Sequence, residues 1–308
     1  MKKILKWIGI VLGGLLGLLL LAALGLYAKT SSQINKTYDV QVKSIIIPTD
    51  VDSIEHGKHL TDVLCAECHG EDLGGKSNWL AIPNIAVISP PNITSGQGSV
   101  TTDFSEEDWI RVLRHGIKPD GKSVFIMRST DYQYLSDEDL GDILAYLKSA
   151  PLVDRADENL HGNYRITFLG NVAYGAGAFG DELAAGRIDH NNLPSSFPAP
   201  GATAEYGEYL VNIHGCRSCH GAQLAGGQPS NPDSGLAPNL TPGGELIAWT
   251  DADFLRAMRT GVALSGHQMN PQFMPWPYKG KMTDDELKAT FLYLQSLPKL
   301  STSTERAQ

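Results

Sequence analysis

The chain has 308 residues, of which 42% are hydrophobic and 19% charged. This length accommodates about two domains, and the composition excludes a coiled coil, a collagen-like repeat and a disordered chain. Acidic residues outnumber Lys and Arg by 34 to 25, giving a net charge of -9. No nucleic-acid partner is expected, because phosphate binding requires a basic surface.

The first predicted element is a transmembrane signal anchor at residues 1–28. Three lysines precede an uncharged run from Trp7 to Tyr27, which at about 1.5 Å per residue is long enough to cross a bilayer. The positive-inside rule places the remainder on the periplasmic side of the cytoplasmic membrane. A cleaved signal peptide is the alternative, because residues 23–25 resemble a cleavage site. Residues 29–54 follow as a polar spacer.

Four cysteines occur in two identical C-x-x-C-H arrangements. The residues are Cys65, Cys68 and His69 in the first, and Cys216, Cys219 and His220 in the second. This is the attachment signature of c-type haem, because two thiols three positions apart reach the vinyl groups of one porphyrin while the adjacent histidine ligates the iron. Disulfides would not need the histidine, and zinc would need further ligands. The sequence therefore predicts two covalently bound haem c groups.

The two motifs belong to a tandem repeat. Matching segments include 57–60 with 207–210 and 91–94 with 238–241. We predict one domain at residues 55–150 and a second at residues 204–298. An ordered connector at residues 151–203 joins them, because its aromatic residues are unusual for a flexible linker. Residues 299–308 form a tail.

Helix starts are predicted where Ser or Thr is followed three positions later by an acidic residue, because this pair satisfies free amide groups of the first turn. The pairs are Ser105 and Asp108, Ser136 and Asp139, Thr250 and Asp253, and Thr283 and Glu286. Apolar residues recur at helical spacing after the last cap of each domain. Each domain is therefore predicted to be helical.

This arrangement resembles a class I cytochrome c domain over residues 55–150 and 204–298. Residues 91–94, 249–254 and Met274-Pro275 are most similar to the cytochrome c subunit of bacterial membrane-bound alcohol and gluconate dehydrogenases. That family carries three haems, whereas two attachment motifs occur here. The resemblance implies an all-α fold of tandem class I cytochrome c domains, preceded by one transmembrane helix.

Each iron needs an axial ligand opposite the motif histidine. In the first domain Met127 is the one methionine after the motif, so elimination selects it. Among four methionines of the second domain, Met274 occupies the same position of the repeat as Met127. Two His/Met haems imply positive reduction potentials. A bis-His site in which His115 or His59 ligates the first iron is the alternative.

The resemblance also implies that a downstream proline carbonyl accepts the other ring N–H of the motif histidine. Pro91 and Pro238 are the candidates, and Pro83 competes with the former. Arg114 and Arg259 are candidates for pairing with haem propionates. The alternative for both arginines is a solvated helix face.

These features predict a membrane-anchored di-haem cytochrome c that is not itself an enzyme. It would transfer electrons between a membrane dehydrogenase or quinol-oxidising complex and a soluble cytochrome or terminal oxidase. The main alternative is a di-haem peroxidase, which needs one open iron position and an acid/base group above it; a haem-based sensor is another. Methionines at equivalent positions favour electron transfer, because they leave neither iron open.

Overall fold

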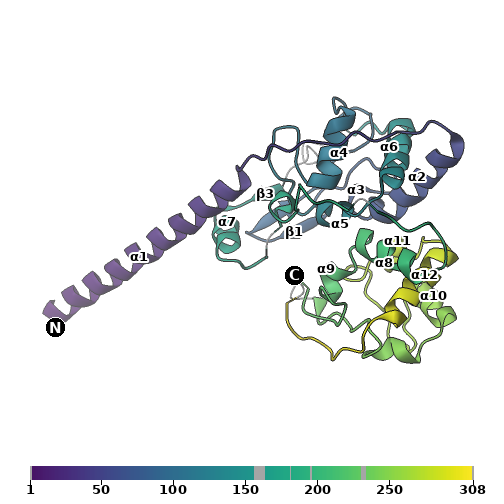
Figure 1. The fold of residues 1–308 in the computed structure, drawn as a ribbon. Coiled ribbons are helices and arrows are strands. Elements are labelled where there is room, and N and C mark those ends of the chain that lie inside the picture. The colour runs from purple at the N-terminus through teal and green to yellow at the C-terminus, as the bar shows by residue number, and fades with distance from the viewer. Residues whose placement is uncertain (1, 156–163, 181, 195, 230–233, 307–308) are drawn as a thin grey trace.

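The computed structural model describes residues 2–155, 164–180, 182–194, 196–229 and 234–306. These residues form a long N-terminal helix, two helical domains and a small three-stranded sheet (Figure 1). Both domains are helical apart from the sheet, which confirms the all-α prediction.

Helix α1 (Lys2–Ile34) projects away from the rest of the protein (Figure 1). Among the described residues it is the one helix long and apolar enough to cross a membrane, and none of its apolar window is buried in protein. Leu19 and Leu21, for example, are 68% and 67% exposed. A helix with this composition and exposure has the surface that a lipid environment requires. It continues beyond residue 28, and its last turns contact the connector.

The first domain is organised around a crossing of its first and last helices. Its elements are α2 (Val51–Leu64), α3 (Ala66–His69), β1 (Leu80–Ile82), β2 (Ala86–Ile88), α4 (Glu106–His115), α5 (Ser129–Tyr132) and α6 (Asp137–Ser149). Helix α2 packs against α6. Gly57 lies at this crossing, where any side chain would overlap the Asp142 carbonyl group.

The second domain repeats this plan. Its elements are α8 (Ala204–Ile213), α9 (Arg217–His220), a 3-10 helix (Glu245–Ala248), α10 (Asp251–Thr260), α11 (Trp276–Lys279) and α12 (Asp284–Ser296). Helix α8 packs against α12, and a side chain at Gly207 would overlap the Ala289 carbonyl group. Gly57 and Gly207 are equivalent in the repeat, so both domains use a glycine to bring their terminal helices into backbone contact.

All four predicted helix starts are confirmed. The caps are Ser105, Ser136, Thr250 and Thr283, and each accepts a hydrogen bond from the amide three positions later. In α4, α10 and α12 the acidic residue at that position returns the bond and completes a capping box. In α6 the Asp139 carboxylate instead accepts from the Tyr209 hydroxyl, which also accepts the Ser136 amide at 3.1 Å. A residue of the second domain thus completes a helix cap of the first.

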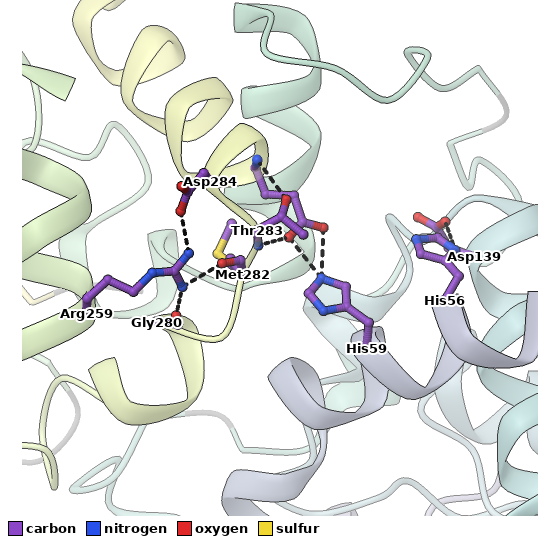
Figure 2. Close-up of polar contacts among 9 residues, drawn as sticks. His56, His59, Asp139, Arg259, Gly280, Met282, Thr283 and Asp284 are labelled. Carbon is purple, nitrogen blue, oxygen red and sulfur yellow. Dashed lines mark hydrogen bonds and ion pairs between the residues drawn. The ribbon is translucent and has the colours of Figure 1, made fainter. Parts of the chain in front are cut away.

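A second contact between the domains joins the residues that are equivalent, in the repeat, to Tyr209 and Asp139. His59 matches Tyr209, and Glu286 matches Asp139. The His59 Nε2 atom lies 2.9 and 3.1 Å from the two carboxylate oxygens of Glu286, beside Thr283 at the start of α12 (Figure 2). Each domain therefore contacts the cap of the last helix of the other.

The connector packs against protein where it is described. Strand β3 (Tyr164–Ile166) pairs antiparallel with β2, which pairs with β1, and α7 (Phe168–Gly175) follows. Further on, a 3-10 helix (Ala184–Gly186) begins beside Phe125, which bridges to Leu183. Connector residues 156–163, 181 and 195 lie outside the described residues.

The segment predicted as a polar spacer lies against the first domain in its second half. Val42, Ile45 and Ile47 are half-buried against the domain core. The Ile46 carbonyl lies where a side chain on Gly141 of α6 would project, so this segment approaches α6 closely. Packing on the first domain therefore begins well before α2.

The His59–Glu286 contact predicts a pH-dependent contribution to stability. The hydrogen bond that His59 donates to the Glu286 carboxylate raises the pKa of His59. Burial would raise the pKa of Glu286, but the same hydrogen bond and the nearby imidazole lower it below its usual value. The His59 contribution is complete below about pH 6.5 and is lost as pH rises through its raised pKa; the Glu286 contribution is complete above about pH 4.3 and is lost as pH falls through its lowered pKa. The pair thus stabilises the fold most between about pH 4.3 and 6.5.

His59→Gln should therefore lower the free energy of unfolding by about 1 kcal/mol in this window, and by less above it. Denaturant unfolding of both proteins across a pH series measures the difference. Lys58→Gln is the control, because the exposed Lys58–Asp62 ion pair lies one residue away on the same helix. A His59→Gln effect that is the same at every pH would contradict the prediction.

Candidate haem sites

The second domain contains a cavity of about 460 Å³ beside its attachment motif. Cys216, Cys219, His220 and Met274 all line it. Much of the remaining wall is apolar, including Leu210, Phe254 and Leu294. This volume lies within the range of about 300–1,000 Å³ typical of cofactor pockets. The cavity thus brings together the two thiols and the imidazole that attachment of a c-type haem requires, and the Met274 thioether lines it as well, so the residues fit that group.

Each motif histidine is oriented by a proline carbonyl. The Nδ1 atom of His69 lies 2.8 Å from the Pro91 carbonyl oxygen, and that of His220 lies 2.8 Å from the Pro238 oxygen. Pro91, and not Pro83, occupies this position. Donation by Nδ1–H leaves the Nε2 lone pair available for a metal. Burial lowers the pKa of both imidazoles, which favours the neutral form that ligates iron.

The Pro-Asn-x-Thr segments explain how these carbonyls are held in place. The Asn92 side chain accepts the Thr94 amide at 2.9 Å and donates to the Val153 carbonyl at 2.7 Å. Asn239 likewise accepts the Thr241 amide at 2.9 Å and donates to the chain after α12. Each asparagine therefore ties the proline loop to the chain beyond the last helix of its domain.

The four cysteines are all free thiols in the structure. Burial raises the pKa of Cys65 and Cys68 to about 12. Within the described residues, the group of three ligands close enough to hold an ion consists of His56, Asp139 and Asp142 and contains no cysteine.

The methionines of the second domain divide into two kinds. Met258 and Met282 are buried core residues, whereas Met269 and Met274 are half-buried. All four line the cavity, so the choice of Met274 still rests on the repeat and stays a prediction.

Met127 of the first domain lies in a constrained segment. The preceding residue, Ile126, has φ of 64°, which is unfavourable for a β-branched side chain. Its amide donates to the Glu182 carbonyl at 2.9 Å, and Phe125 bridges to Leu183. The connector therefore holds the Met127 segment in this conformation, and strained backbone of this kind concentrates at functional sites. The role of Met127 as an axial ligand stays a prediction.

The two alternative histidines have other partners. His59 binds Glu286, and the His115 Nδ1 atom lies 3.1 Å from His190 Nδ1. Burial and His190 lower the pKa of His115 to about 4. These contacts hold both imidazoles in interactions that do not involve the attachment motifs.

The two candidate propionate ligands bind groups of their own domains. Arg114 donates to the Leu135 carbonyl at 2.9 Å and pairs with Asp137 at 2.6 Å. Arg259 donates to the Met282 carbonyl and pairs with Asp284, as Figure 2 shows. The contact with haem propionates stays a prediction for both.

Sequence reasoning missed a pair of cations at the domain interface. Arg128, directly after Met127, donates to the His214 carbonyl at 3.0 Å, just before the second attachment motif. Lys279 of α11 donates to the Val63 carbonyl at 3.2 Å, just before the first. Burial and the nearby Arg128 lower the pKa of Lys279 to about 8.

Of these two cations, only Arg128 is marked by an unusual feature of the sequence. Pro275 follows Met274, whereas Arg128 follows Met127, and the structure explains this difference by the contact of Arg128 with the other domain. Each predicted methionine ligand is thus followed by a segment that contacts the end of the helix before the attachment motif of the other domain.

Known proteins match the chain over both domains. The cytochrome c family model matches residues 54–151 and 204–298. The chain is similar to the fructose dehydrogenase cytochrome subunit of Gluconobacter japonicus, with 24% identity over 80% of this chain and 53% of that protein. It is also similar to the cytochrome c subunit of quinone alcohol dehydrogenase from Gluconobacter oxydans, with 26% identity over 79% of this chain and 54% of that protein. It thus spans about half the length of these two relatives.

A shorter relative matches over most of its own length. This is the diheme cytochrome c-type protein of Cereibacter sphaeroides, with 26% identity over 76% of this chain and 82% of that protein. The family match covers both repeats, each with its attachment motif and its proline-bound histidine. The chain therefore belongs to the cytochrome c family, and it is an electron-transfer protein that carries covalently bound haem c.

Proposed function

We propose that the chain carries two haem c groups, one in each domain, and relays electrons between redox proteins at a membrane. The observation that carries this proposal is the repetition of one site: a C-x-x-C-H helix whose histidine donates to a proline carbonyl at 2.8 Å in both domains. Haem c bound there would supply a one-electron iron couple. The cysteines would anchor it, His69 and His220 would ligate iron, and Met127 and Met274 would complete the coordination.

The crossed contacts between the domains support a single electron-transfer unit. Arg128 and Lys279 connect the segment after each methionine with the end of the helix, α8 or α2, that precedes the attachment motif of the other domain. These contacts are short and partly or fully buried, so they hold the helix ends before the two attachment motifs at one interface. Two independent carriers joined by a flexible linker would not need them.

The proposed setting is the cytoplasmic membrane, with α1 as a single-pass anchor and both haem domains on the periplasmic side. Two relatives are named as cytochrome subunits of dehydrogenases, which supports a membrane dehydrogenase as the electron donor. A quinol-oxidising complex is the alternative donor. A soluble cytochrome or a terminal oxidase would accept the electrons.

Two covalent haems per chain are the direct expectation. Protein expressed with haem-maturation machinery should keep about two haems after denaturation and extraction with acidified organic solvent, because thioether bonds survive both treatments. The pyridine haemochrome spectrum, referred to protein concentration, gives this number. One retained haem, or none, would contradict the proposal.

A further inference from the structure

Helix α7 has an apolar surface that stays about half exposed in the described part of the chain. Residues 166–180 contain no charged side chain. Phe168 and Leu169, at the start of the helix, are 52% and 55% exposed. They are adjacent on one short helix, and the neighbouring connector residues Ala176 and Ala178 are also exposed.

This surface is continuous with α1. The Tyr27 ring stacks on Phe168 with ring centroids 5.4 Å apart. Thr30 Oγ1 donates to the Asn171 carbonyl at 2.7 Å, and Lys29 Nζ donates to the Gly175 carbonyl at 2.9 Å. Figure 1 shows α7 beside the end of α1 that joins the haem domains.

The position of α7 along α1 corresponds to a membrane boundary. The uncharged run begins at Trp7 and ends at Tyr27, a helical length of about 30 Å that equals the hydrocarbon thickness of a bilayer. Trp and Tyr are enriched at both boundaries of spanning helices. Because α7 contacts Tyr27, Lys29 and Thr30, it lies at the level of the outer boundary.

We propose that α7 lies in the outer lipid–water boundary and inserts Phe168 and Leu169 among the lipids, next to α1. This inference rests on the proposed anchoring by α1. It gives the first domain a second attachment to the bilayer, because α7 is fixed to that domain: the Thr167 amide donates to the Ile85 carbonyl at 2.9 Å, and its hydroxyl donates to Asn84 at 2.7 Å. One attachment would permit rotation about α1, whereas two fix the domain relative to the membrane plane.

The test compares the accessibility of two engineered thiols in the full-length holoprotein. Leu169→Cys is placed in α7, and Leu292→Cys, at a residue that is 45% exposed in α12 of the second domain, is the matched control. The native cysteines are consumed by haem, so one thiol per chain reacts. Both variants are incorporated into nanodiscs of phosphatidylcholine and phosphatidylglycerol and treated with a charged, membrane-impermeant thiol reagent.

Leu169→Cys should react about tenfold more slowly than Leu292→Cys, because interfacial helices bury their apolar face about 5–10 Å into the boundary. Phe168→Cys should be protected to the same degree. Equal rates for the α7 and control thiols in nanodisc-bound protein would overturn this inference and leave the anchoring by α1 intact. Failure of the protein to enter nanodiscs would overturn both the insertion of α7 and the anchoring by α1. Haem content and electron transfer would be unaffected by that result, so it would not contradict the proposed electron relay.

Discussion

Met274→His is expected to keep the second iron six-coordinate while lowering its midpoint potential. A thioether favours ferrous iron more than an imidazole does. The decrease should be on the order of 0.1 V or more, within the roughly 0.8 V range that axial ligands span. The weak sulfur-to-iron charge-transfer band of the oxidised protein in the far red should lose the contribution of this haem. Spectroelectrochemical titration measures the potential and the band together.

Met282→Leu is the matched control, because Met282 lines the same cavity but is buried in the core. It should leave the band and the potential unchanged. Met127→His should change the first haem alone. If the wild-type protein lacked the band for one haem, and that haem bound cyanide or reacted rapidly with peroxide, an open iron would be present. The peroxidase interpretation would then replace electron relay.

Gly207→Ala is expected to destabilise the second domain by about 3 kcal/mol or more, at the upper end of overpacking costs. The new methyl group would overlap the backbone carbonyl of Ala289, and a backbone group cannot move aside as a flexible side chain can. Helices α8 and α12 would have to separate, which opens the haem cavity, because Leu210 of α8 and Leu294 of α12 both line it. For a domain of this size about 1 kcal/mol lowers Tm by about 4–8 °C, and thermal unfolding followed by circular dichroism measures the shift.

Glu205→Ala serves as the control, because this residue is exposed on the same helix. Its effect should lie within about 0.5 kcal/mol of zero. Gly57→Ala should reproduce the large effect in the first domain, where Asp142 takes the place of Ala289. A Gly207→Ala protein with wild-type Tm would show that the helices cross at a greater separation.

The sequence was sufficient to predict the helix starts and the haem-attachment residues, because the interacting groups lie within a few residues of one another along the chain. Thr283 and Glu286, for example, satisfy one another across a single turn. The proline assignment was harder. Pro83 and Pro91 have similar sequence contexts, and only the folded loop places the Pro91 carbonyl against His69.

Contacts between distant segments could not be predicted in this way. The Tyr209–Asp139 and Lys279–Val63 contacts join the two domains, and neither residue type indicates its partner in advance. Asp139 had the pattern of a capping box, yet its carboxylate binds Tyr209, because burial between the domains offers it a hydroxyl donor. The packing of α7 on α1 likewise depends on Gly175, whose missing side chain permits close approach to the Leu26 carbonyl.

The reciprocal contacts of His59 with Glu286 and of Tyr209 with Asp139 have the pattern of an isologous interface, in which position i contacts j and j contacts i. The chain is therefore built like a two-fold homodimer whose subunits have become one polypeptide. Because the connector keeps both domains in one chain, contacts too weak to hold separate subunits together are sufficient. One contact pairs an imidazole with a carboxylate, and the other pairs a phenol with a carboxylate. The two domains are therefore no longer chemically equivalent at this interface, although the geometry of the contacts is still that of a two-fold dimer.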